Sequence, residues 1–123
     1  MNAEQGAAIA VVVDDASLRH SLLRLFRSAG YSVAGFASAI DLLDSFATRK
    51  PRCIILDLQL PDMSVELLEC FATLADAPPV VVITSDDDPR VRDQCIALGA
   101  QRYFRKPLDC DALLEAAGEL VGA

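Results

Sequence analysis

Six polar residues stand directly after short runs of the sequence that read as β-strands. They are Asp14, Asp15, Asp57, Thr84, Ser85 and Lys106. Three carboxylates held close together repel one another unless a cation lies among them. Mg²⁺ prefers oxygen ligands and is usually held by one or two carboxylates and a phosphate oxygen, and the absence of Cys and His from these positions disfavours zinc and iron. The residue types therefore predict a Mg²⁺ site.

The same group of residues suits phosphoryl chemistry. A carboxylate such as Asp57 can act as a nucleophile and form an aspartyl phosphate. Phosphoryl transfer needs positioning and charge neutralisation, which a metal ion and the ammonium group of Lys106 would supply. The hydroxyl of Thr84 would add a donor to the same phosphoryl oxygens. These residues therefore predict that Asp57 accepts a phosphoryl group.

Short β-branched runs alternate along the chain with longer segments of helical period, a pattern typical of repeated β-α units around a parallel sheet. The predicted strands are 8–13, 32–36, 53–56, 80–83 and 101–105. In an open parallel sheet, the ligand crevice lies outside the carboxyl ends of the strands. That edge is where the six polar residues would meet.

Each of the five predicted helices carries a stripe of apolar residues spaced for burial. The stripes are Leu18, Leu22, Leu25, Phe26 and Ala29; Leu42, Leu43 and Phe46; Leu67, Leu68, Phe71 and Leu74; Val91, Cys95 and Leu98; and Leu113, Leu114, Ala117 and Leu120. We expect Gly30 and Gly99 to end helices, and Ser38, Asp88 and Asp109 to cap helix starts.

The 123 residues are 53% hydrophobic and 24% charged, which predicts one compact domain over residues 1–123. A formal charge of -7 argues against direct binding to nucleic acid, which needs clustered Lys and Arg. The four cysteines have no C-x-x-C spacing, so we interpret them as reduced thiols of a cytoplasmic protein. The N-terminus has no pattern of a signal peptide or membrane anchor, and we expect no membrane partner.

Four short motifs occur in order, each at the end of a predicted strand. They are VVVDD at 11–15, DLQLPDMS at 57–64, VVVITS at 80–85 and YFRKPL at 103–108. With these motifs the chain resembles, over about residues 8–121, the receiver domain of two-component response regulators, and in wording it is closest to the nitrogen-fixation regulator type. The resemblance implies a doubly wound (βα)5, flavodoxin-like three-layer α/β sandwich with a parallel five-stranded sheet of order 2-1-3-4-5.

The resemblance also implies a role for each residue at the strand ends. Asp57 would accept the phosphoryl group and share in binding the metal. Asp15 would ligate Mg²⁺ directly, Asp14 would do so directly or through water, and the backbone carbonyl of Gln59 would complete the protein's share of the metal shell. The chain would then be a signalling module that catalyses its own phosphoryl transfer and dephosphorylation, not an enzyme acting on an external substrate.

The switch and the partners likewise follow from the resemblance. Lys106 would pair with the phosphoryl group, and Thr84 would bond to it and draw the following loop inward. Tyr103 stands where the family has its switch aromatic. Movement of Thr84 and Tyr103 would reshape the surface formed by the fourth helix, the fifth strand and the fifth helix. The donor would be a histidine kinase or a phosphotransfer protein. A DNA-binding output domain outside this chain and a phosphorylation-dependent homodimer are the other partners expected.

The sequence departs from the family pattern in two places. The chain reads Ser64-Val65 where a Gly usually intervenes, so the loop after the phosphorylation site must follow another path. The run Asp86 to Asp88 places extra negative charge at the rim of the pocket, which either tightens metal binding or slows an anionic phosphodonor. These departures motivate an alternative, a degenerate receiver that binds partners without phosphorylation.

Other interpretations of the same residues stay open at this point. Asp15 and Asp57 could cap helices, Tyr103 could be a core aromatic, and His20 could be a surface residue or a kinase contact. A metal-dependent phosphohydrolase would usually carry a second Asp where this chain has Gln59. A flavin-binding protein of this fold would need a hydroxyl- and Gly-rich loop after the first strand, where this chain reads DDASLRH.

Overall fold

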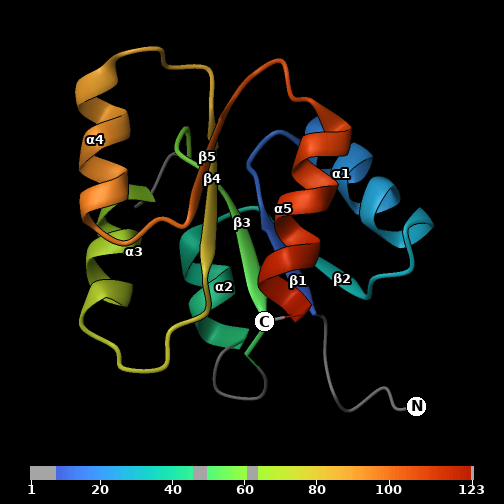
Figure 1. Ribbon diagram of the computed structural model, residues 1–123. Coiled ribbons are helices and arrows are strands. Elements are labelled where there is room, and N and C mark those ends of the chain that lie inside the picture. Colours follow the sequence, from blue (N-terminus) through green and yellow to red (C-terminus); the bar gives the residue numbers. More distant parts are fainter. Residues whose placement is uncertain (1–7, 46–49, 61–63, 123) are drawn as a thin grey trace.

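The computed structural model describes residues 8–45, 50–60 and 64–122, and in them five strands alternate with five helices (Figure 1). The strands are β1 (Ile9–Val12), β2 (Val33–Phe36), β3 (Cys53–Asp57), β4 (Val80–Thr84) and β5 (Arg102–Arg105). The helices are α1 (Ala16–Ser28), α2 (Ala39–Ser45), α3 (Ser64–Ala72), α4 (Pro89–Ala97) and α5 (Cys110–Gly122). This order confirms the predicted repetition of β-α units.

All strand pairs are parallel, and the order across the sheet is β2-β1-β3-β4-β5. The order predicted by the resemblance is therefore confirmed. The direction of the chain across the sheet reverses beside β1, between β1 and β3, which is where ligands bind in folds of this kind. The register pairs Val12 with Leu56, and Leu56 with Val82, so β1, β3 and β4 end at nearly the same level.

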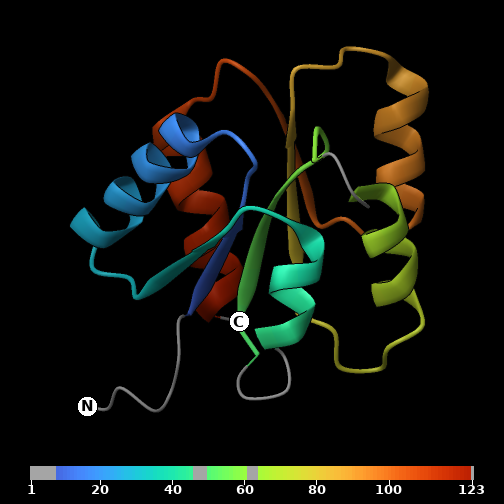
Figure 2. The ribbon, with the colours of Figure 1, turned by 180° about the vertical axis from the view of Figure 1, so that it is seen from behind.

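Alternate residues of the central strands pack into two separate cores. Val12, Ile54 and Val82 face α2, α3 and α4, whereas Val11, Ile55 and Val81 face α1 and α5. Figures 1 and 2 show the same arrangement, with α1 and α5 on one side of the sheet and the other three helices on the opposite side. The molecule is the predicted three-layer sandwich, because both faces of the sheet are covered.

The described residues of β1, β3 and β4 are buried throughout, while those of β2 and β5 are mostly half-buried. This difference follows from position, since β2 and β5 are the two edges of the sheet. Each fully buried Val, Leu, Ile or Phe contributes about 1.5–3 kcal/mol through removal from water. The central strands thus hold their carboxyl ends in a rigid frame.

The predicted helix boundaries are largely confirmed. Gly30 and Gly99 have φ angles of 96° and 106°, a left-handed conformation that glycine adopts easily. Asp88 caps α4 by accepting from the Arg90 N–H, and Pro89 follows as the first helical residue.

Two further helix starts have the caps that the sequence predicts. The Ser38 hydroxyl accepts a hydrogen bond from the Asp41 N–H at 3.1 Å, and the Asp109 carboxylate accepts from the Ala112 N–H at 3.1 Å. Both contacts satisfy a backbone donor of the first helical turn that has no partner inside the helix. The starts of α2 and α5 are therefore specified locally, each by a residue just outside the helix.

Two described residues of the predicted helix stripes are exposed, and several others, such as Leu18 and Leu114, are half-buried. Ala29 is the exposed C-cap residue of α1, and Leu74 is 43% exposed because α3 ends at Ala72 and a turn carries the chain away from the core. The predicted stripe residue Phe46 lies outside the described residues. The strands also run one residue further than predicted at two ends, so that Asp57 and Thr84 are themselves the last residues of β3 and β4.

All four cysteines are free, as predicted. Cys53 and Cys95 are buried, and Cys70 and Cys110 are exposed. Within the described ranges, the helices are too short or too polar for any of them to cross a membrane.

Candidate functional site

Asp57 and Lys106 form a shielded ion pair at the carboxyl edge of the sheet. Asp57 ends β3 and is only 4% exposed, and Lys106 follows directly after β5. The Lys106 ammonium donates to Asp57 Oδ2 at 2.8 Å, and the Gln59 backbone N–H donates to Asp57 Oδ1 at 2.9 Å. A carboxylate withdrawn this far from water needs such partners, because an unpaired buried charge is strongly unfavourable. Asp57 is therefore not a helix cap.

The carboxamide of Gln59 connects this pair to the next strand. Its Oε1 accepts from Lys106 Nζ at 2.9 Å, and its Nε2 donates to the Ser85 hydroxyl at 2.6 Å. The Ser85 backbone N–H makes a longer contact of 3.4 Å with the same Oε1. The ends of β3, β4 and β5 are thereby joined through one side chain. The sequence indicated only the backbone carbonyl of Gln59 as a site group.

Thr84 and the loop that follows it are held by several hydrogen bonds. Thr84 is completely buried, and its Oγ1 accepts from the Asp86 N–H at 3.0 Å. The Asp86 carboxylate accepts from the Asp88 N–H at 2.9 Å. The Tyr103 hydroxyl donates to the Asp86 carbonyl at 3.3 Å. Thr84 and Tyr103 are thus linked through a single residue of the loop.

Burial raises the pKa of the Tyr103 phenol, and the neighbouring Cys95 and Asp86 add to the shift. The phenol therefore keeps its proton at neutral pH and acts as a hydrogen-bond donor. Its ring is half-buried and packs against the core beneath α4. Tyr103 thus contacts the loop after β4 through its hydroxyl, and its ring also fits the alternative interpretation of a core aromatic.

Asp14 and Asp15 lie beyond the end of β1, next to β3, and both are exposed. The Asp15 carboxylate caps α1 by accepting from the N–H groups of Ser17 and Leu18 at 3.3 and 3.4 Å. Asp15 therefore caps α1, as one interpretation of the sequence expected. In the ranges that the structure describes, no three His, Cys, Asp or Glu side chains converge as a metal-binding cluster.

The donor set at this edge nevertheless fits a hard divalent cation. Mg²⁺ takes oxygen ligands, keeps several waters and needs only one or two carboxylates from the protein. Asp14 and Asp15 offer exposed carboxylates, and each Asp15 oxygen retains a second acceptor position beside its long capping contact. The Asp57 carboxylate and the Gln59 carbonyl stand on the neighbouring strand end.

Arg19 secures the loop that carries the two exposed aspartates. Its Nη1 donates to the carbonyls of Val13 and Asp14 at 2.8 and 3.1 Å. The Arg19 side chain reaches them by passing over Gly35 of β2, where an added Cβ would lie 3.2 and 3.3 Å from its Cδ and Cγ atoms. The sequence did not indicate this contact. Its only signal is the spacing of four residues between Asp15 and Arg19.

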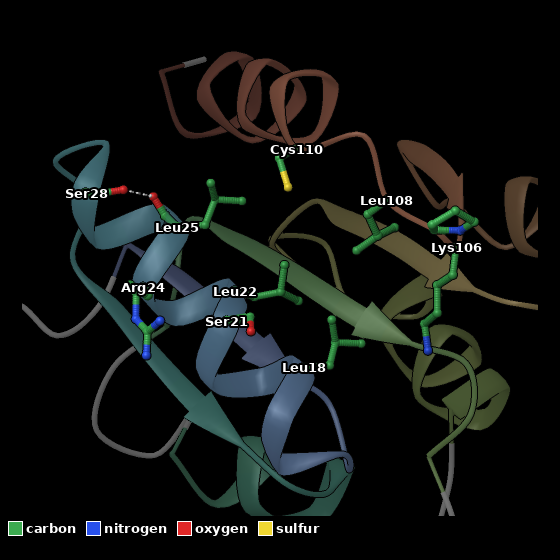
Figure 3. A pocket seen from close by; sticks show the side chains of 10 residues that line it. Leu18, Ser21, Leu22, Arg24, Leu25, Ser28, Lys106, Leu108 and Cys110 are labelled. Atoms are coloured by element: carbon green, nitrogen blue, oxygen red, sulfur yellow. Dashed lines mark hydrogen bonds between the residues drawn. The ribbon is translucent and has the colours of Figure 1, made fainter.

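An apolar groove of about 570 Å³ runs beside the ion pair, between α1 and the segment from Lys106 to Cys110. Figure 3 shows Leu18, Leu22 and Leu25 of α1 facing Leu108 and Cys110 across it. The Lys106 side chain extends from its rim toward the end of β3 (Figure 3). His20 is exposed on another side of α1, as predicted.

The two departures from the family pattern are accommodated without backbone strain in the described residues. Val65 lies in the first turn of α3, and among the residues described no non-glycine residue has a positive φ. The loop residues 61–63 lie outside the described ranges. In the acidic run, Asp88 is the α4 cap, and the neighbouring Arg90 pairs with it and lowers the pKa of its carboxyl group.

Comparison with known proteins places these residues in a family. The model of the response regulator receiver domain matches residues 9–118. Nodulation protein W of Bradyrhizobium diazoefficiens is 35% identical over 111 residues, which cover 89% of this chain and 49% of that protein. Response regulator MprA of a Mycobacterium species is 32% identical over 107 residues, covering 86% of this chain and 46% of that protein. The chain thus spans about half the length of these relatives.

Solved structures agree with the curated relatives. A response regulator receiver protein from Burkholderia phymatum has a TM-score of 0.81 and 34% identity, covering 93% of this chain and 94% of that one. Full-length FixJ from B. japonicum has a TM-score of 0.81 and 29% identity, covering 95% of this chain and 60% of that one. Fold, strand-end residues and relatives agree, and the chain belongs to the receiver domain family of two-component response regulators.

Proposed function

We propose that this receiver domain is a phosphoacceptor and that Asp57 takes the phosphoryl group from a histidine kinase or a phosphotransfer protein. The observation that carries the proposal is the pairing of a nearly buried carboxylate with Lys106 at 2.8 Å. The pairing holds one carboxylate oxygen in place and puts a positive charge where phosphoryl oxygens would arrive.

The proposed reaction consists of two displacements at phosphorus. An Asp57 oxygen attacks the phosphorus of the phosphohistidine, the P–N bond breaks, and the released imidazole takes up a proton. In the return step, water attacks the same phosphorus, the bond from the Asp57 oxygen to phosphorus breaks, and phosphate leaves. In both steps Lys106 neutralises charge on the phosphoryl oxygens.

The metal-binding part of the proposal assigns Asp14, Asp15, Asp57 and the Gln59 carbonyl as ligands. A bound Mg²⁺ would supply neutralisation of the phosphoryl oxygens and a template for their orientation. Arg19 supports this arrangement, because it holds the backbone carbonyls beside both exposed aspartates. Asp15 would serve as ligand and α1 cap together, so the start of α1 and the metal site are positioned by the same carboxylate.

The proposed switch starts at Thr84. The buried Thr84 hydroxyl now accepts from the Asp86 N–H, so a movement of Thr84 toward a phosphoryl oxygen would pull Asp86 along or break this contact. The loop then moves inward, and Asp86 is also the residue whose carbonyl Tyr103 holds. Movement of that loop would therefore reach Tyr103 and reshape the surface formed by α4, β5 and α5.

The proposed partners follow from the same surfaces. The apolar groove between α1 and the β5–α5 segment adjoins Lys106, which makes it a suitable contact for a phosphodonor protein. A DNA-binding output domain and a phosphorylation-dependent homodimer belong to the proposal as well, since relatives are about twice as long as this chain. The four free thiols support a cytoplasmic location.

Intact-mass spectrometry after incubation with Mg²⁺ and a small phosphodonor tests the proposal. Acetyl phosphate and phosphoramidate are the donors, because the second contains the P–N bond of phosphohistidine. We expect one phosphoryl adduct that requires Mg²⁺ and is absent from Asp57→Asn. If a folded wild-type protein forms no adduct with either donor or with phosphorylated phosphotransfer proteins, the phosphoacceptor proposal is wrong, and the degenerate receiver replaces it.

A further inference from the structure

The carboxamide of Gln59 has hydrogen-bond partners at both its oxygen and its nitrogen, which the sequence did not predict. Its oxygen lies 2.9 Å from Lys106 Nζ, and its nitrogen lies 2.6 Å from the Ser85 hydroxyl. The Gln59 backbone N–H is fixed separately, on Asp57 Oδ1. The side chain therefore spans from the ion pair to the loop after β4, while its own backbone is held in place.

We infer that Gln59 is a positioning residue: in the resting protein its carboxamide bridges Lys106 and Ser85, and so ties residues 85–88 to the Asp57–Lys106 pair. Residues 85–88 form the β4–α4 loop. Ser85, Asp86 and Asp87 are exposed and Asp88 is half-buried, so the loop has no buried apolar anchor of its own. Its position thus depends on hydrogen bonds, of which the Gln59 bridge is the one that leads to the charged pair.

The bridge gives the loop a response to a change of charge at Asp57. Lys106 now shares its ammonium group between a carboxylate and a neutral amide oxygen. A phosphoryl oxygen carries much more negative charge than an amide oxygen, and charge-assisted hydrogen bonds are the stronger ones. Lys106 would therefore leave Gln59 for the phosphoryl group, and the carboxamide would lose its charged partner. This second step rests on the proposed function, whereas the resting bridge does not.

The resting bridge is tested in unphosphorylated protein by amide hydrogen exchange, read by NMR. Gln59→Met keeps the length of the side chain without its polar atoms. Ser85→Ala removes the hydroxyl at the other end and leaves only the longer contact of the backbone N–H of residue 85. Each is expected to speed exchange at Ser85 and Asp86 roughly two- to tenfold, the effect of one lost hydrogen bond. The double variant should be no faster than the faster single variant, because both remove the same link.

The matched control is Gln101→Met. It changes an exposed glutamine just before β5, at the amino ends of the strands and so away from the site. It is expected to leave exchange at Ser85 and Asp86 unchanged. Unchanged exchange in a folded Gln59→Met protein overturns the inference. The inference is also overturned if the increases in exchange caused by Gln59→Met and Ser85→Ala add in full in the double variant, since full addition would show two independent contacts.

The response to charge is tested on the side-chain amide signals of Gln59. They are expected to shift in Lys106→Met without any donor, and to shift in wild-type protein after acetyl phosphate and Mg²⁺, with the adduct followed by mass on the same sample. An adduct without a shift overturns the response while the phosphoacceptor function stands. Absence of the adduct speaks against the phosphoacceptor function, and the exchange experiment still decides the bridge.

Discussion

Cys53 and Asp57 are the first and last residues of β3, and both are buried, but they differ in their polar partners. The Cys53 thiol is completely buried, and burial raises its pKa to about 12. Asp57 is nearly as buried, but Lys106 and the Gln59 N–H supply both of its oxygens with partners. Burial alone acts on the thiol, whereas the buried carboxylate also has two hydrogen-bond donors beside it.

The raised pKa of Cys53 predicts a loss of stability in alkaline solution. In the unfolded chain the thiol ionises near its ordinary pKa of 9.0, while in the folded protein it holds its proton up to about 12. Between these values the unfolded state has fewer bound protons, so the free energy of unfolding falls with rising pH, by up to about 1.4 kcal/mol per pH unit. Urea unfolding at several pH values measures the slope.

Cys53→Val should make that slope shallower, because an apolar residue of similar size has no proton to lose. Part of the slope will remain, since burial also raises the pKa of Cys95 and of Tyr103. Cys110→Val, at an exposed thiol, is the control and should keep the wild-type slope. Equal slopes for Cys53→Val and the wild type would mean that Cys53 does not cause the loss.

The sequence was informative about those site residues whose place depends only on the strands. Asp57 and Thr84 end strands and Lys106 follows one, and parallel strands bring such ends to one edge. The Gln59 carboxamide and the Arg19 guanidinium could not be predicted in the same way. Their contacts depend on side-chain torsions and on the approach of separate loops, which leave no periodic pattern in the sequence.

At the scale of elements, the packing of α5 against the end of α1 depends on a missing side chain. A Cβ added at Gly118 would lie 2.7 Å from the Tyr31 hydroxyl. Tyr31 cannot turn away freely, because its ring packs edge-on against buried Phe26 with 6.3 Å between ring centroids. Gly118 is therefore required by close approach, although glycine lowers the stability of a helix interior.

Gly118→Ala is expected to lower the free energy of unfolding by about 1 kcal/mol, because the overpacking penalty exceeds the gain in helix propensity. In the Tyr31→Phe background the hydroxyl is gone, and the same substitution should become neutral or stabilising. Urea unfolding of the two single variants and the double variant gives both values. Gly122→Ala is the matched control, since nothing lies within 4 Å of its added Cβ. A stabilising Gly118→Ala in wild-type protein would contradict this account.

Element boundaries were predictable where a local signal marks them and not where only packing does. The left-handed Gly30 and Gly99 and the caps Asp88 and Asp109 are local signals, and the structure has all four in place. The end of α3 has no such signal, so Leu74 kept the helical spacing in the sequence but lies outside the helix. The strand order came from the family resemblance, because no hydrophobic pattern encodes it.

At the scale of the whole molecule, the two layers of helices divide the surface around one reactive edge. The layer of α1 and α5 presents the apolar groove beside Lys106, and the opposite layer includes α4, which begins at the end of the β4–α4 loop. Between them, Asp14, Asp15 and Asp57 stand at the carboxyl ends of the neighbouring strands β1 and β3, in a chain with a formal charge of -7. A cation bound at this edge would offset the repulsion between these carboxylates.

That charge distribution predicts that Mg²⁺ stabilises the fold. A ligand that binds only the folded state adds about 2.7 kcal/mol at a hundred times its dissociation constant, so the midpoint of thermal unfolding should rise with Mg²⁺ and fall back with EDTA. Asp15→Asn should abolish the rise, while Asn, also a good N-cap, preserves the start of α1. Without metal, the variant should be at least as stable as the wild type, because one repelling carboxylate has been removed.

Circular dichroism at constant ionic strength, adjusted with NaCl, separates this binding from general screening of charge. Asp76→Asn is the control: it removes one carboxylate between α3 and β4, at the opposite edge of the sheet, and should keep the full response to Mg²⁺. If Asp15→Asn and Asp76→Asn respond equally to Mg²⁺, the cation acts on the net charge of the whole molecule and Asp15 is not a ligand. If only Asp15→Asn loses the response, the cation is bound at the strand ends, where Asp57 would use it.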